Sequence, residues 1–162
     1  QPLIYTGQEI GLDRRLEFFE KDPITDWSAN AYTAFWKSLV DLKHQNPALA
    51  AGERGGKITW WDAPEGWVAF HRQVKDNMVI VLANFGVPVK QEAAEEKADA
   101  NDNRPQGDKV AVPFLNLESA PVAMTLNLKG EYRNVFTGEV ITTPYDIALA
   151  PGEYMVLTKV NK

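Results

Sequence analysis

The sequence contains no cysteine, no cluster of lysine and arginine, and no long apolar run. The absence of cysteine excludes disulfides and thiolate metal sites, and it leaves the redox compartment undecided. The longest apolar stretch, residues 78–83, is far shorter than the roughly 20 residues that span a bilayer, so no membrane span is expected. Seventeen basic and 22 acidic residues give a net charge of -5, which argues against nucleic acid as a partner.

The first nine residues are typical of a buried strand that runs directly into a polar loop. Leu3–Tyr5 is a short apolar run, and Gly7 permits a sharp turn. Gln8 and Glu9 would then lie at the C-terminal end of the strand, where barrel enzymes keep their catalytic residues. Because a lone strand can neither bury its faces nor pair its backbone groups, we expect this chain to be a piece of a larger protein.

A helix is predicted further along, after a polar segment that we interpret as a loop with one helical turn. From Ser28, a suitable N-cap, apolar residues recur at spacings of three and four up to Gln45. Asn46 and Pro47 end the helix. Strand, loop and amphipathic helix form one βα unit, the repeating element of a (β/α)8 barrel. The apolar residues of the helix are Tyr32, Phe35, Trp36, Leu39 and Leu42.

The pattern changes after residue 51, and we place a domain boundary there. Residues 52–162 carry about seven or eight β-like runs separated by turn residues, with no helix between them. The predicted fold class is therefore mainly β: an antiparallel Greek-key β-sandwich, preceded in residues 1–51 by the terminal βα unit of a barrel. The runs are 58–61, 67–74, 77–84, 122–128, 132–136, 140–143 and 154–160.

Residues 91–109 interrupt this pattern with an acidic, alanine-rich sequence. The segment has no apolar residue larger than alanine, so we interpret it as a flexible surface insertion. Asp99, Asp102 and Asp108 could supply oxygen ligands to a hard cation, but their spacing matches no calcium loop. No metal site is predicted from them.

Several segments resemble the α-amylase family of glycoside hydrolases. In that family a Pro-x-x-Tyr-x-Gly-x-Glu pattern marks the eighth barrel strand, and Pro2–Glu9 is similar to it. Leu42–Leu49 resembles the exit of the eighth helix, and two later segments are similar to the C-terminal β-sandwich called domain C. The resemblance covers nearly the whole chain, with the specific motifs in residues 1–51. The remaining similar segments are Arg15–Asp22 with Trp27, Asn134–Glu139 and Leu149–Tyr154.

This resemblance implies a retaining glycosidase that cleaves α-glucosidic bonds of starch or maltodextrins with two carboxyl groups about 5 to 5.5 Å apart. In the family these groups and a third aspartate lie on the fourth, fifth and seventh strands, so all three would precede Gln1. We therefore expect no catalytic residue in this chain and no hydrolysis by the chain alone. No cofactor is expected here, and the calcium of many family members would bind mainly upstream. Related enzymes with other bond specificities share this architecture, so the substrate stays open.

The resemblance implies that Tyr5, Glu9 and Arg15 lie at the wall of the substrate cleft. Glu9 occupies the carboxylate position of the motif, and structural hydrogen bonding of the loop is its alternative role. Arg15 belongs to a charged segment that borders the cleft in related enzymes. A solvated charge cluster is the simpler interpretation of that segment.

Trp60 and Trp61 are candidates for stacking on a sugar ring. Because they are adjacent in a predicted strand, their side chains should point to opposite faces. We favour the alternative that the outer one is covered by a neighbouring helix or by the barrel. His44 and His71 have no partner at metal-ligand spacing, so no metal residues are assigned.

The expected partners are the remainder of the catalytic barrel and, through the whole enzyme, an α-glucan. Without the barrel, the aromatic face of the helix should pack on the sandwich. The opening strand should then be poorly ordered, pair with a sandwich edge, or associate with a second copy. A polysaccharide-acting enzyme favours a secreted, periplasmic or cell-surface location. The alternative function is that of a β-sandwich module that binds carbohydrate or another partner and has no catalytic activity.

Overall fold

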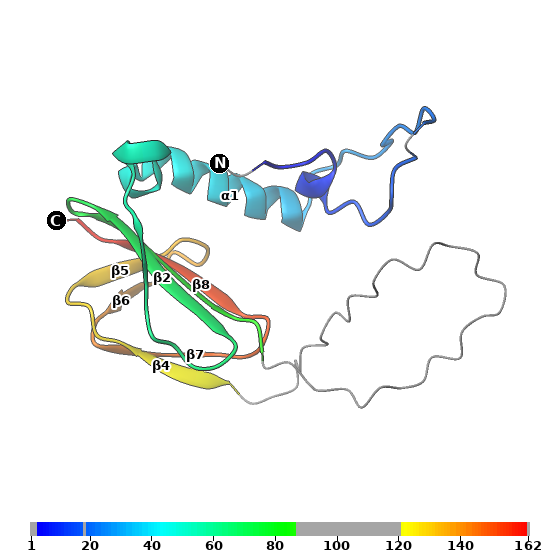
Figure 1. Ribbon diagram of the computed structural model, residues 1–162. Helices are drawn as coiled ribbons and strands as arrows, with labels where there is room; N and C mark the ends of the chain where they lie inside the picture. The colour runs from blue at the N-terminus through cyan, green and yellow to red at the C-terminus, as the bar shows by residue number, and fades with distance from the viewer. Residues whose placement is uncertain (1–2, 18, 87–120, 162) are drawn as a thin grey trace, which may run out of the picture.

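A computed structural model describes residues 3–17, 19–86 and 121–161, so the predicted insertion at 91–109 lies outside the described residues. Figure 1 shows α1 (Ala31–Gln45) above a β-sandwich. Three short 3₁₀ turns accompany it, η1 (Gln8–Ile10), η2 (Pro47–Leu49) and η3 (Gly52–Arg54). The strands are β1 (Ile58–Trp60), β2 (Trp67–Val74), β3 (Asn77–Asn84), β4 (Val122–Leu126), β5 (Glu131–Asn134), β6 (Val140–Thr142), β7 (Tyr145–Leu149) and β8 (Tyr154–Lys159).

The strands form two antiparallel sheets. One sheet has six strands in the order β1-β2-β3-β8-β5-β6, and the other pairs β4 with β7. This confirms the predicted mainly β class with antiparallel pairing. β2 and β3 have the predicted bounds, because Lys75 and Asp76 make a tight turn between two long apolar runs. β7 was not predicted; Tyr145–Leu149 follows Pro144 directly.

The main core lies between the two sheets. Along β3, Met78, Ile80 and Leu82 join this core, whereas Val79 and Val81 belong to a second cluster on the opposite face, toward α1. This alternation follows from the two-residue period of a strand. Each fully buried large apolar side chain stabilises the fold by about 1.5–3 kcal/mol relative to exposure. The other core members are Trp67, Ala69, Leu126, Tyr132, Ile141, Ile147, Leu149 and Leu157.

Helix α1 begins two residues later than predicted, because Asn30 rather than Ser28 caps it. The Asn30 side chain accepts hydrogen bonds from the backbone N–H groups of Tyr32 and Thr33, and the Thr33 hydroxyl accepts one from the Asn30 N–H. This reciprocal pair is a capping box. Ser28 instead donates its backbone N–H to the Asp26 carboxylate, in a turn that precedes the helix.

One side of α1 packs on the six-stranded sheet, as predicted. The Phe35 ring stacks on Phe136 with ring centres 5.5 Å apart, and it meets the edge of Tyr154 at 5.9 Å. Leu42 joins the cluster that contains Val79 on the same face of the sheet. Tyr32, which the sequence placed on the apolar face of this helix, is not buried against the sheet, and its side chain is 57% exposed.

The predicted opening strand does not form in its described part, residues 3–5. Leu3–Tyr5 has no regular structure, and the side chains of Leu3 and Tyr5 are 82% and 67% exposed. A strand requires a neighbour for its backbone N–H and C=O groups, and no described strand lies beside this segment. The predicted terminal βα unit of a barrel is therefore not seen in this structure.

Candidate functional site

The polar loop that follows residue 5 is fastened to the first half of α1. Three side chains of the helix and its cap donate hydrogen bonds to three successive carbonyl oxygens of the loop, at 2.8–3.0 Å. Because these donors are spaced three apart, they lie on one side of the helix. The pairs are Trp36 Nε1 with Gln8 O, Thr33 Oγ1 with Glu9 O, and Asn30 Nδ2 with Ile10 O. We call this arrangement the carbonyl ladder.

The carbonyl ladder fixes the backbone of Glu9, but its carboxylate is left unsatisfied. Glu9 Oε2 is out of contact with solvent and has no hydrogen-bond partner among the described residues. A buried carboxylate oxygen without a partner is costly, so a donor that meets it would stabilise the loop. The sequence motif singled out Glu9, and only the structure reveals that its oxygen lacks a partner.

Two of the three predicted cleft-wall residues come together, and the third does not join them. Tyr5 and Arg15 line one hollow of about 360 Å³, together with Gly7 and Arg14. Glu9 is not among the residues that line it. Within the loop that lines this hollow, the Tyr5 backbone N–H donates a hydrogen bond to the Gln8 side chain at 2.8 Å.

The charged segment beside this hollow contains a well-formed ion pair. Arg14 donates to both carboxylate oxygens of Asp22, at 2.6 and 2.8 Å, and the Glu17 backbone N–H donates to the same carboxylate. The hydrogen bonds from Arg14 lower the pKa of Asp22 to about 2. The pair is at the surface, so it orders the segment more than it stabilises the fold.

Trp60 and Trp61 point to opposite faces of the sheet, as predicted. Trp61 packs against the inner core and donates its indole N–H to His71 Nδ1 at 2.8 Å. Burial lowers the pKa of His71, which suits its role as a neutral acceptor. Trp60 is 63% exposed on the outer face, with its ring edge against Phe70 at 5.1 Å.

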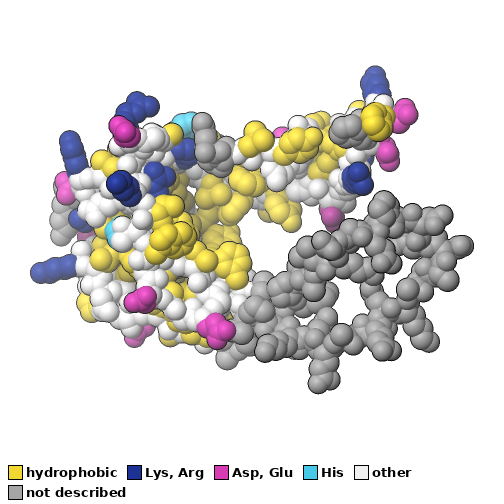
Figure 2. All heavy atoms as spheres, in the orientation of Figure 1, with side chains coloured by type: hydrophobic (Ala, Val, Ile, Leu, Met, Phe, Trp, Pro, Cys, Tyr) yellow, Lys and Arg dark blue, Asp and Glu magenta, His cyan; other side chains and the backbone are white. Residues whose placement is uncertain are grey.

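An apolar groove of about 590 Å³ runs between α1 and the outer face of the six-stranded sheet. Figure 2 shows hydrophobic side chains gathered in the hollow beneath the helix. We call it the α1 groove. The sequence indicated the apolar face of each element but not the groove between them, because its shape depends on how far α1 reaches across the sheet. Its apolar lining includes Phe35, Leu39, Leu42, Ile58, Phe70, Val81, Phe85 and Tyr154.

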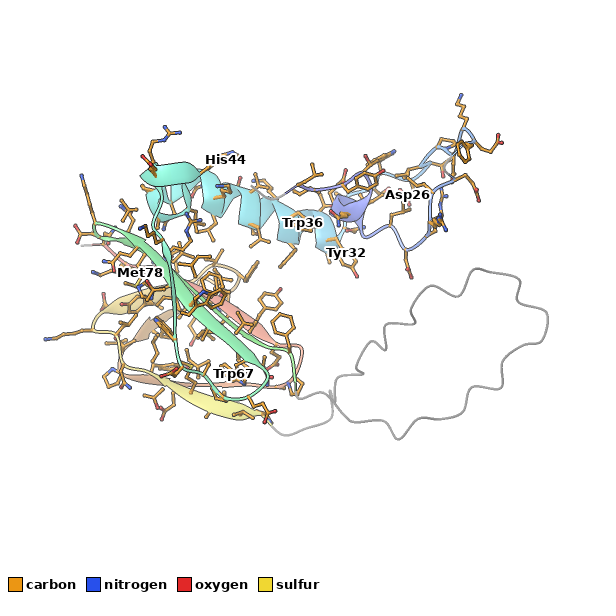
Figure 3. The ribbon with its side chains drawn as sticks, viewed as in Figure 1. Asp26, Tyr32, Trp36, His44, Trp67 and Met78 are labelled. Carbon is orange, nitrogen blue, oxygen red and sulfur yellow. The ribbon has the colours of Figure 1, made fainter. Side chains whose placement is uncertain are left out.

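A second hollow, of about 830 Å³, lies at the N-terminal end of α1. It mixes aromatic side chains, Tyr32, Trp36 and Tyr154, with the polar Gln8 and Asp13. Figure 3 shows Tyr32 and Trp36 on the half of α1 that adjoins the N-terminal loop, whereas Trp67 and Met78 lie in the sandwich.

The described residues offer no metal site and no membrane-spanning helix. Across residues 3–17, 19–86 and 121–161, no group of three or more His, Asp or Glu side chains could hold a metal ion. No helix in the same ranges has both the length and the apolar character to cross a bilayer.

Known proteins resemble this chain in fold and not in sequence. No protein-family model and no curated protein matches the sequence. Solved structures of α-amylases do match. A noncanonic maltogenic α-amylase, AmyB from Thermotoga neapolitana, aligns with 99% of this chain at a TM-score of 0.64 and 13% identity. An α-amylase from Geobacillus thermoleovorans, solved with acarbose, aligns with 85% at 0.52 and 16% identity.

The chain spans 33% of the first of these enzymes and 25% of the second. The likeness therefore establishes that this chain shares its fold with a part of α-amylase-family enzymes. At these levels of identity the likeness concerns the fold alone, and the activity has to be argued from the residues.

Proposed function

We propose that this chain is the C-terminal part of an α-amylase-type glycoside hydrolase that acts on α-glucosidic bonds of starch or maltodextrins. Residues 1–51 complete its catalytic barrel, and residues 52–162 form its domain C. Two lines of support agree: the motifs of the first 51 residues, and a fold match to the T. neapolitana amylase that takes in nearly the whole chain but only a third of that enzyme. The role of this part is to support the fold of the enzyme.

The observation that carries the proposal is that the sheet covers only part of the apolar surface of α1. Phe35, Leu39 and Leu42 line the groove on the sheet side. Tyr32, toward the N-terminal end of the same face, is 57% exposed, Val40 beyond this face is 38% exposed, and no residue of the helix is buried. A helix of the outer layer of a barrel needs both sides, one for the barrel and one for the sandwich.

The proposed enzyme uses its catalytic carboxylates upstream of this chain, and the N-terminal loop contributes to the cleft wall. Tyr5 and Arg15 line the hollow of this loop, and the carbonyl ladder holds the backbone of Glu9 against α1. A loop that is held rigidly in this way can keep a bound substrate in one orientation. The chain alone then binds at most the edge of a substrate and hydrolyses nothing.

The test compares the 162-residue chain with the longer protein that its coding region specifies. The longer protein should hydrolyse a chromogenic maltooligosaccharide, and the chain alone should not. Three acidic motifs on successive predicted barrel strands should precede Gln1. Turnover by the purified chain above a mock purification would refute the proposal, and so would an upstream sequence without these motifs.

The alternative function is a carbohydrate-binding sandwich module without catalysis. The hollow at the N-terminal end of α1 favours it, because Tyr32 and Tyr154 are about half exposed and Gln8 and Asp13 stand beside them. Aromatic faces with adjacent polar groups suit a sugar ring. Titration of the chain with maltoheptaose, followed by tryptophan fluorescence, distinguishes the two. No change at millimolar sugar would count against the module.

A further inference from the structure

Helix α1 covers only part of the sheet face on which it lies. Its contacts reach β3 and β8, through Val79 and Val156, and the segment after β5, through Phe136. Neighbouring strands lie about 4.8 Å apart, so the β1–β2 edge adds roughly 10 Å of sheet beyond these contacts. This is about the width of one helix with its side chains.

The turn η2 packs on β2 and β3, and the segment after it covers this edge around Arg72; the part of the edge that neither α1 nor this segment covers is apolar. Ile58 and Trp60 of β1 face Arg72 and Phe70 of β2 in register, so all four lie on the side of the sheet that faces α1. Ile58, Trp60 and the nearby Phe85 are 50%, 63% and 54% exposed. Several large apolar side chains exposed together on a single face are characteristic of an interaction surface.

The polar side chains of the α1 groove are already used by the backbone of this chain. Arg72 donates to Gly56 O at 2.7 Å and Ala50 O at 3.0 Å, and Lys43 donates to Leu49 O at 2.6 Å. The side chains of Asn84 and Glu153, which complete the polar lining, are bonded in the same way to Leu149 O and to the Ala150 N–H. A sugar needs directed hydrogen bonds as well as an aromatic face, and this groove has few groups left to supply them. An apolar occupant fits better.

The shape of the groove indicates the kind of occupant. The sheet forms its floor, and Phe35, Leu39 and Leu42 of α1 form a wall. The groove therefore continues the helix-on-sheet interface that α1 already makes, and a helix laid beside α1 would extend the same layer. β1, with three residues, is too short to recruit an added strand over much length.

We propose that a second amphipathic helix, belonging to the catalytic part of the whole enzyme, docks in the α1 groove beside α1. It contacts Ile58, Phe70 and Phe85, which line the groove, and covers Trp60, which adjoins the groove through Phe70. This inference rests on the proposed function, and it names the surface that joins the sandwich to the barrel. Trp60 is then an anchor of an interface between domains and has no part in binding sugar.

The test is hydroxyl-radical footprinting of the 162-residue chain and of the longer enzyme, read by mass spectrometry. Trp60 should be labelled strongly in the chain and several-fold less in the enzyme. Tyr145 is the matched control, because it is 39% exposed on β7 of the other sheet and should be labelled alike in both. In the enzyme, Trp60→Glu should lower the thermal midpoint more than Tyr145→Glu does.

Each other outcome overturns the inference. Equal labelling of Trp60 in an enzyme that hydrolyses maltoheptaose would refute the docked helix and leave the proposed function standing. Protection that appears in the chain alone as its concentration rises would mean that a second copy fills the groove. Protection of Trp60 in the chain by millimolar maltoheptaose would mean a sugar site. If no catalytic barrel precedes the chain, this inference and the proposed function fail together.

Discussion

The indole N–H of Trp36, in α1, donates a hydrogen bond of 3.0 Å to the carbonyl oxygen of Gln8, 28 residues earlier in the chain. With the bonds from Thr33 and Asn30 it forms the carbonyl ladder that fixes the N-terminal loop. Among the described residues, the other hydrogen bonds of residues 5–12 join groups at most five positions apart, such as the bond from the Gly11 N–H to Gln8 O. The loop and α1 should therefore order and disorder together.

Replacing Trp36 with Phe tests this coupling, because it removes the N–H donor and keeps most of the aromatic volume. We expect the loop to lose about 0.5–1.5 kcal/mol of local stability. Amide exchange of Gly11 and Leu12, measured by NMR, should accelerate. Trp27→Phe is the control: Trp27 donates only to Ile24 O, three residues away, so its loss should leave those amides unchanged. Equal acceleration in both variants would contradict the ladder.

The charged segment should lose the Arg14–Asp22 ion pair at low pH, when the Asp22 carboxylate is protonated. The pKa of Asp22 is lowered from 3.8 to about 2, so the pair is fully formed above pH 3.8 and is lost as the pH falls through about 2. The Asp22 carboxyl resonance should titrate with a midpoint near 2. In Arg14→Gln the midpoint should move up toward 3.8, and in Arg15→Gln it should not. A midpoint near 3.8 in the unmodified chain would show that the pair does not form in solution.

The strands of the large sheet were the most predictable part of the fold. Long alternating runs with a turn between them specified β2 and β3, and the adjacency of Trp60 and Trp61 correctly predicted their opposite faces. The opening strand is not seen here, because Leu3–Tyr5 has local strand character but no neighbouring described strand to pair with. Local pattern specifies a propensity, and strand formation also needs a partner.

The candidate site was predictable only in part. The motif in residues 2–9 pointed to Tyr5 and Glu9, the charged segment after it pointed to Arg15, and the structure brings Tyr5 and Arg15 to one hollow. The α1 groove and the carbonyl ladder depend on contacts between residues about 20 to 120 positions apart, which a single sequence does not encode in any local period. The spacing of Asn30, Thr33 and Trp36 was the available signal, since polar donors three apart share one side of a helix.

His71 should make the stability of the sandwich depend on pH. Its pKa is lowered from 6.5 by burial, and its Nδ1 accepts the Trp61 N–H, so a proton on Nδ1 would oppose that bond. The unfolded chain takes up the proton at higher pH than the folded chain does. This contribution to the free energy of unfolding is therefore complete above pH 6.5 and is lost as the pH falls through the lowered pKa.

Chemical denaturation between about pH 5 and 7 measures this effect. His71→Gln should flatten the rise in unfolding free energy with pH, and His44→Gln, which also removes one histidine, should keep the part due to His71. Trp61 fluorescence should change over the same range in the unmodified chain. A slope that survives in His71→Gln would assign the pH dependence to another group.

Gly56 and Gly52 should respond differently to substitution, because Gly56 is limited by close backbone atoms and Gly52 by its positive φ angle. A Cβ on Gly56 would lie 2.5 Å from the backbone N and O of Gln73, on the strand β2 that pairs with β1. A Cβ on Gly52 would meet nothing within 4 Å, but Gly52 has φ +65°, a conformation that Asn adopts more readily than Ala.

Gly56→Ala and Gly56→Asn should therefore each cost about 1–3 kcal/mol through overpacking. Gly52→Ala should cost about 1–2 kcal/mol through backbone strain, and Gly52→Asn clearly less. Urea denaturation of the four variants measures these differences. If Asn is tolerated equally at both positions, the close approach of Gly56 to β2 does not constrain the fold.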